Sequence, residues 1–204
     1  MIEQCSCKVS ERILHRREEI LEAATDMFAE FGYRSTDVQQ IADSLKIGKG
    51  TIYRYFPTKE ELFFATADRA MQAMETFIRQ RLEGVTEDVA RVRKVIRSYI
   101  EFYKTNPKFI ELFVQERAEF RRREVSTYLT HRAGRDGKWR AMFERLFKGG
   151  YLRVSNTDLI IEYLTNGLYG IVFTNVLSNW LSEDPAVDQA IDMLLYGFIR
   201  EEKK

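Results

Sequence analysis

The chain has 204 residues, of which 45% are hydrophobic and 31% charged, so it is long enough to bury a core and too apolar to be a disordered chain. The 32 basic and 31 acidic residues give a net charge of +1, and this balance by itself indicates no partner. Three prolines and no run of alternating β-branched residues favour a mostly helical fold. No apolar run reaches the length of a membrane span and the N-terminus lacks a signal-peptide pattern, so we expect a cytoplasmic protein with no membrane contact.

Residues 1–10 precede any periodic pattern, and we expect them to form a disordered tail. The tail contains Cys5 and Cys7. Two thiols cannot complete a four-ligand metal site, so a sensing role would need His15 or a second subunit. Reduced cysteines in a loose tail explain the pair equally well, and we predict no metal site and no cofactor.

A helix is predicted from about Glu11, because apolar residues recur along one face at helical spacing. Gly32 is expected to end this helix in a left-handed conformation. Thr36 is then the expected N-cap of the next helix, with Asp37 at its positively polarised end.

The stretch from Asp37 to Phe56 has the spacing of a helix-turn-helix. Ile41 and Leu45 would share one face of a first short helix, and Ile52 would bury a second helix from about Lys49 to Tyr55. The outward face of the second helix combines cationic, hydroxyl and phenolic groups, which suit a DNA major groove. These side chains are Lys49, Thr51, Tyr53 and Arg54. An ordinary helical hairpin with a solvated face would show the same periodicity.

Three motifs extend the pattern on both sides of this stretch. They are Ile20-Leu21-x-Ala23-Ala24-x-x-x-Phe28-x-x-x-Gly32-Tyr33, Ile41-Ala42, and Gly50-Thr51-x-Tyr53-x-Tyr55-Phe56-x-x-Lys59-x-x-Leu62. With these motifs the segment from about Arg17 to Phe63 resembles the N-terminal domain of the TetR (tetracycline repressor) family of bacterial transcription regulators. Two positions depart from the family pattern, since Lys46 replaces the usual turn glycine and Gly48 the usual capping serine.

The resemblance implies a ligand-responsive repressor that binds a palindromic operator in double-stranded DNA as a homodimer. The candidate DNA-binding residues are Arg34, Thr36, Lys49, Gly50, Thr51, Tyr53, Arg54, Tyr55 and Lys59. Between Arg34 and Lys59 there are five basic residues and two acidic ones, which is the local surplus that phosphate contact requires.

The rest of the chain is predicted to be helical. Thr58 and Glu61 form a capping box that begins a long helix, and Gly84 ends this helix beyond about Leu82. Asn106-Pro107 is expected to open another helix, with the asparagine as N-cap. We therefore predict an all-α fold of about nine helices, with a DNA-binding domain over residues 11–57 and a ligand-binding and dimerisation domain over residues 58–204.

An effector pocket in the second domain is implied by the resemblance, and we expect it to take a small apolar or aromatic molecule. The candidate lining residues are Tyr99, Tyr103, Phe113, Glu116 and Phe120. Such an aromatic stripe is equally typical of an ordinary helical core.

Charge is distributed unevenly over the second half of the chain. Residues 117–153 contain eleven basic and four acidic side chains, whereas residues after Val154 contain three basic and eight acidic ones. The basic part could attract an anionic ligand, pair with the acidic part or solvate a long helix, and we favour the solvated helix. Gly134 and Gly137 predict a kink or break within it.

The segment from Thr157 to about Trp180 is apolar on nearly all sides, and a last helix is expected from Pro185 to about Arg200. We predict that these two helices pair with their copies in a four-helix dimer interface. The expected interface residues are Leu164, Gly167, Leu168, Gly170, Ile171, Ile191 and Leu195. The alternative is a buried central helix whose glycines pack inside the subunit.

Nothing in the sequence indicates catalysis, because His15 and His131 are far apart and no nucleophile stands beside a base. We therefore predict no catalytic residue. A helical adaptor that does not bind DNA and an all-α enzyme remain the alternative functions.

Overall fold

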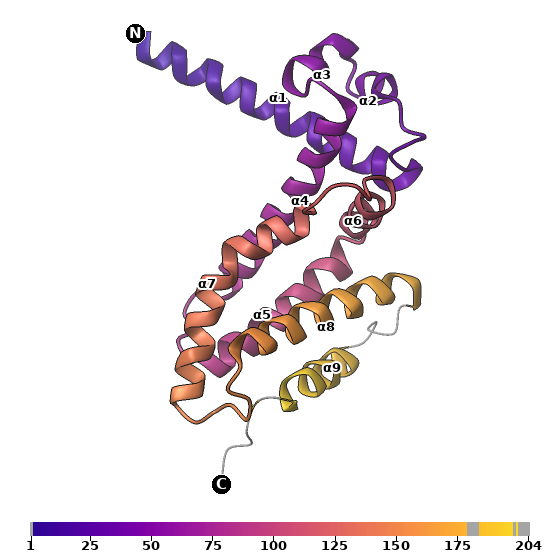
Figure 1. Cartoon of the computed structure of the whole chain (residues 1–204). Helices are drawn as coiled ribbons and strands as arrows, with labels where there is room; N and C mark the ends of the chain where they lie inside the picture. The colour runs from indigo at the N-terminus through magenta and orange to yellow at the C-terminus, as the bar shows by residue number, and fades with distance from the viewer. Residues whose placement is uncertain (1, 179–183, 198, 200–204) are drawn as a thin grey trace. The chain divides into compact units, whose positions relative to one another are not determined.

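Helices account for most of the chain. The computed structural model describes residues 2–178, 184–197 and 199, without the side chains of residues 2–10, 133–136, 175–178 and 184. Within these ranges the protein has nine helices and no strand, which confirms the predicted all-α class (Figure 1). An isolated bridge joins Leu152 and Ile199.

The helices follow the predicted order, with some different ends. They are α1 (Ile2–Phe31), α2 (Val38–Ser44), α3 (Lys49–Tyr55), α4 (Lys59–Arg81), α5 (Asp88–Thr105), α6 (Lys108–Glu119), α7 (Thr127–Lys148), α8 (Thr157–Ser178) and α9 (Asp184–Tyr196). Helix α1 begins well before Glu11, and residues 2–10, which contain no glycine or proline, continue it where a disordered tail was expected. The side chains of Cys5 and Cys7, and the expected helix ends at Trp180 and Arg200, lie outside the described residues.

The chain divides into two compact units. The first contains Met1–Met71 and Glu111–Thr127, and the second contains Gln72–Ile110 and Tyr128–Lys204. The start of α4 belongs to the first unit because Leu62 and Phe63 are fully buried there. The boundary between the units therefore differs from the predicted one at residue 58, and the functional roles of the two parts remain predictions.

Two of the predicted turn and cap residues have the expected conformation, and a third does not. Gly32 is left-handed with φ of 85° and its N–H donates to the Phe28 carbonyl at 3.0 Å, as predicted. Thr58 caps α4 as predicted, since its hydroxyl oxygen accepts from the Glu61 N–H at 3.0 Å. The prediction for Asn106 was wrong: its side-chain amide donates backwards to the Phe102 carbonyl at 2.8 Å, so it caps the end of α5.

Helix α5 forms the centre of the second unit, where it packs against α8 and α9. Its inward face is fully or almost fully buried at Val92, Ile96 and Ile100. Helix α7 is continuous through Gly134 and Gly137, so the predicted break is absent from this described helix. Among the described residues, no helix is long and apolar enough to cross a membrane.

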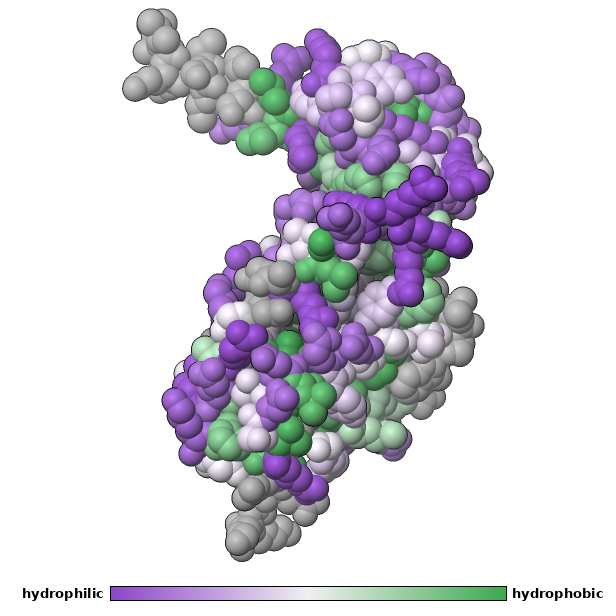
Figure 2. All heavy atoms as spheres, viewed as in Figure 1, coloured by the Kyte–Doolittle hydropathy of each residue, from purple (hydrophilic) through white to green (hydrophobic). Residues whose placement is uncertain are grey.

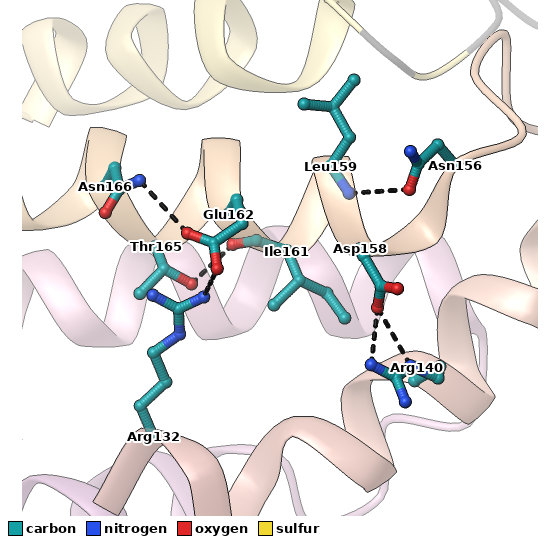
Figure 3. A network of polar contacts seen from close by, with 9 residues as sticks. All are labelled: Arg132, Arg140, Asn156, Asp158, Leu159, Ile161, Glu162, Thr165 and Asn166. Carbon is teal, nitrogen blue, oxygen red and sulfur yellow. Dashed lines mark hydrogen bonds and ion pairs between the residues drawn. The ribbon is translucent and has the colours of Figure 1, made fainter. Parts of the chain in front are cut away.

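Ion pairs join the basic helix α7 to the acidic start of α8 (Figure 3). Arg140 donates to the Asp158 carboxylate at 2.6 Å, and Arg132 pairs with Glu162. The favoured interpretation of α7 as a merely solvated basic helix was therefore wrong for these arginines. Charge pairing between the two segments, the alternative left open by the sequence, accounts for them.

Most of the predicted dimer residues lie inside the subunit. Leu164, Leu168, Ile191 and Leu195 are buried in the monomer. A Cβ at Gly167 would meet Leu194 of α9 at 2.9 Å, so that glycine allows close packing within the chain. Gly170 and Ile171 remain partly accessible, and Gly170 faces open space. The large apolar side chains exposed on these two helices are Leu159, Tyr163, Met193 and Tyr196.

The turn between α2 and α3 contains a left-handed residue where the similar family has glycine, since Lys46 has φ of 54°. Lys46→Gly should raise the melting temperature, because glycine relieves about 1 kcal/mol of left-handed strain. Differential scanning calorimetry measures the change. Gly32→Ala is the matched comparison at another left-handed position and should lower the melting temperature. A lower value for Lys46→Gly would mean that the lysine side chain makes a contact stronger than the strain.

Candidate nucleic-acid interface

Two short helices and a tight turn form the predicted helix-turn-helix. Val38, Ile41 and Ala42 of α2 are buried together with Ile52 of α3, so the two helices share one apolar contact. The turn is closed by the Ile47 N–H, which donates to the Ala42 carbonyl at 3.0 Å. Burial of these side chains fixes which face of α3 points outward.

The outward face of α3 presents polar side chains and little bulk. Tyr53 and Arg54 are exposed, and Thr51 is half-buried beside the Arg54 guanidinium at 3.4 Å. A Cβ at Gly50 would meet nothing within 4 Å, so another molecule can approach the backbone there. Gly48 begins α3 without a side-chain cap, in agreement with the loss of the usual serine. Figure 2 shows a mainly hydrophilic surface over α2 and α3.

The cap of α2 is Asp37, and the prediction of Thr36 as N-cap was wrong. The Asp37 carboxylate accepts from the Gln39 N–H, and Gln40 completes a capping box. Thr36 is 1% exposed, and its hydroxyl donates to the carbonyls of Gly32 and Met27. Its side chain therefore supports the loop and is not available to a DNA phosphate.

Asp37 also holds a predicted DNA-binding cation. The Lys49 ammonium donates to the Asp37 carboxylate at 2.9 Å. The bond from the Gln39 N–H and the bond from Lys49 lower the pKa of Asp37, and the carboxylate raises the pKa of Lys49. The ionised cap thus stabilises the folded protein at pH values above the ordinary pKa of aspartate. This contribution is lost as the pH falls through the lowered pKa of Asp37.

Lys59 and Arg34 meet at the loop between α1 and α2. The Lys59 ammonium lies 4.7 Å from the centre of the Tyr33 ring and donates to the Arg34 carbonyl at 3.3 Å. Burial lowers the pKa of Lys59. The Arg34 guanidinium pairs with Glu119 of α6 at 2.5 Å. Both cations lie at the same edge of the first unit as the start of α2.

Helix α6 supports this edge, which the sequence did not predict. The Gln115 side chain accepts from the Tyr33 N–H and donates to the Phe28 carbonyl, each at 2.8 Å. The Phe120 ring contacts Tyr33 and Phe63 with centroid distances of 4.9 and 5.5 Å. A glutamine within a helix has no signature that would reveal such a long-range partner.

The predicted effector residues are divided between the two units. Tyr99 and Tyr103 are buried in the second unit, whereas Phe113, Glu116 and Phe120 belong to the first. The Glu116 carboxylate is already engaged inside the protein, because it is buried and accepts from the N–H of Thr127 at 2.8 Å. The pocket itself stays a prediction.

These features define a helix-turn-helix DNA-binding domain, in which a buried apolar contact presents α3 and a basic loop edge. Residues 20–66 match the family described as bacterial regulatory proteins, tetR family. The helix-turn-helix segment of this chain is therefore similar to the DNA-binding domain of that family.

Relatives with similar sequences are bacterial regulators. The chain is 36% identical over 106 residues to an uncharacterised HTH-type transcriptional regulator, YhgD of Bacillus subtilis. The aligned region is 52% of this chain and 55% of YhgD. It is 37% identical over 84 residues to the HTH-type transcriptional regulator HbdR of Aromatoleum, and this aligned region is 41% of this chain and 37% of HbdR. The chain thus aligns with about half, or less, of the length of these relatives.

Solved structures share the fold across nearly the whole chain. The fatty acid degradation regulator FadR from Bacillus halodurans has a TM-score of 0.74 and 20% identity, and covers 88% of this chain and 94% of that protein. FadR from Bacillus subtilis, solved in complex with stearoyl-CoA, has a TM-score of 0.73 and 17% identity, and covers 88% of this chain and 98% of that protein. At these identities the similarity shows the fold alone.

Asp37→Asn should tighten DNA binding, because it removes an acidic charge from the candidate interface and releases Lys49. Asparagine caps helices as well as aspartate, so α2 should persist. The loss of one acidic charge and of one competing ion pair predicts a gain on the order of three- to tenfold at moderate salt. Fluorescence anisotropy with a labelled DNA duplex measures this. Unchanged or weaker binding by a folded variant would contradict the proposed position of this pair against DNA.

Proposed function

We propose that the protein is a DNA-binding transcriptional regulator that acts in the bacterial cytoplasm as a repressor. The observation that carries the proposal is the outward face of α3, where Thr51, Tyr53 and Arg54 surround an open backbone at Gly50. A hydroxyl, a phenol and a guanidinium on one helix can hydrogen-bond to base edges and phosphates. Lys59 and Arg34 would contact phosphates at the end of the same site.

The short length of the recognition helix α3 favours a homodimer on a two-fold-symmetric operator. One helix of this kind contacts a few base pairs, and two related copies are needed for a palindromic site with half-sites about 34–36 Å apart. The exposed apolar side chains on α8 and α9 support a partner surface there. Gly170 would let the backbone of a second α8 approach closely.

A small apolar or aromatic effector would bind in the second unit. The supporting observation is Ser98 of α5, which is fully buried and whose hydroxyl has no hydrogen-bond partner among the described residues. An unpaired buried hydroxyl is costly, so a ligand that supplied a partner would be favoured. Tyr99 and Tyr103 are buried aromatic side chains of the same helix.

Lys59→Ala should weaken binding to all DNA sequences by a similar factor and reduce the log–log salt dependence by about one unit per subunit, since it removes one phosphate contact. DNA selected from the source genome by the wild-type protein serves as the probe, and anisotropy at several salt concentrations gives the slope. Lys148→Ala, which removes an exposed cation in the second unit, is the charge-matched control. Wild-type protein that shows no salt-dependent DNA binding would refute the proposed function.

Gly170→Leu should dissociate the dimer, because leucine would separate the two copies of α8, and operator affinity should fall with it. The open space at Gly170 means that the monomer itself should still fold. Gly167→Leu is the contrasting variant, since its side chain would collide with Leu194 inside the subunit and lower the melting temperature. Sedimentation measures the oligomeric state. A Gly170→Leu protein that stays dimeric and binds DNA normally would place the interface elsewhere.

A further inference from the structure

A basic hollow lies beside the helix-turn-helix in the first unit. It has a volume of about 820 Å³ and is lined by Arg34, Glu60, Phe64 and residues 118–123. Positions 121–123 are three consecutive exposed arginines in the loop between α6 and α7. The lining therefore contains four arginines and two glutamates, a surplus of two positive charges. In Figure 2 strongly hydrophilic side chains project where this loop runs in Figure 1.

The third arginine anchors the loop. The Arg123 guanidinium donates to the buried Glu116 carboxylate at 2.8 Å and to the Thr127 hydroxyl at 3.2 Å. It also lies 3.9 Å from the centre of the Phe64 ring. Glu116 in turn accepts from the N–H of Thr127 at the start of α7. Arg123 is therefore engaged within the protein and fixes the loop that carries its two neighbours.

Arg121 and Arg122 have no such engagement. Both are exposed, and among the described residues neither has a hydrogen-bond or ion-pair partner. Two adjacent cations held on a fixed loop repel each other unless an anion lies between or against them. An arginine guanidinium binds phosphate with two parallel hydrogen bonds, so phosphate oxygens are its best-matched exposed partners.

The hollow is continuous with the candidate DNA-binding edge. Arg34 lines it, and the carbonyl of the same residue accepts from Lys59. The ring of Phe120, directly before Arg121, packs on Tyr33 at 4.9 Å. The Gln115 side chain bonds that fasten α6 to the end of α1 hold this arrangement. The loop that carries the two unpaired arginines therefore lies beside the loop that carries Arg34.

We propose that Arg121 and Arg122 bind backbone phosphates of DNA that flanks each half-site. This inference rests on the proposed DNA-binding function and adds a second contact region to it. DNA fits better than a small anion, because the two cations are exposed and project outward, whereas a small ligand would need donors that enclose it. DNA offers evenly spaced phosphates along the same edge that Arg34 and Lys59 occupy.

The test compares two duplexes that carry the same site, selected from the source genome by the wild-type protein. One is trimmed to the shortest length that still binds, and the other has roughly ten additional base pairs on each side, about one helical turn. Arg121→Ala/Arg122→Ala should reduce the salt slope by about two units per subunit on the long duplex. When salt rises from 50 to 200 mM, the affinity of the wild type for the long duplex should therefore fall by a factor that is roughly ten times larger, per subunit, than the factor for the variant.

Three further measurements make the result specific. On the trimmed duplex the Arg121→Ala/Arg122→Ala variant should have the same salt slope as the wild type. Arg121→Lys/Arg122→Lys should retain most of the slope, because it keeps both charges. Lys138→Ala/Lys148→Ala removes two exposed cations from the second unit and should leave the slope unchanged on both duplexes.

An arginine double variant with wild-type slope on the long duplex would overturn the inference, and so would an equal loss on both duplexes. In either case the wild-type protein still binds DNA, and the proposed function stands. If the wild type itself binds neither duplex with salt dependence, the proposed function fails and the inference fails with it.

Discussion

The candidate interface depends on an aromatic cluster beneath the loop between α1 and α2. Phe28 and Phe63 are fully buried, and Tyr33 and Phe120 pack against them. Edge-to-face contacts of this kind add to the burial of large rings and constrain their angles. The cluster fixes the loop backbone, and with it the positions of the cations that would meet phosphate. Without this packing the loop and its cations would lose their support.

The cations of the interface are held by weak internal pairs. Lys49 pairs with Asp37, and Arg34 pairs with Glu119. Exposed pairs like these contribute little to stability, so a phosphate can replace the carboxylate at small cost. The pairs therefore orient the side chains in the absence of DNA without preventing contact with it. The same reasoning explains why Arg121 and Arg122, which have no such pair among the described residues, matter for the charge of this edge.

The second unit has a different organisation, since ion pairs surround an apolar centre. Asp88 at the start of α5 accepts from Arg145 of α7 at 2.8 Å, and other arginines of α5 and α7 pair with α8 and α9. These contacts lie outside the buried face of α5. The exposed apolar side chains of α8 and α9 take no part in these ion pairs, which suits a surface that would be covered by a second copy.

By itself, the sequence determined the helical class, the position of α2 and α3, and the left-handed residue Gly32, because periodicity and backbone conformation are local properties. Tertiary structure decided which side chains meet. Tertiary packing buries Thr36 and Glu116 and places Leu164 and the other predicted interface leucines in the subunit core. It also brings Gln115 to the end of α1. These outcomes depend on residues far apart in the chain, and an apolar helix pattern shows that a face is buried without showing what covers it.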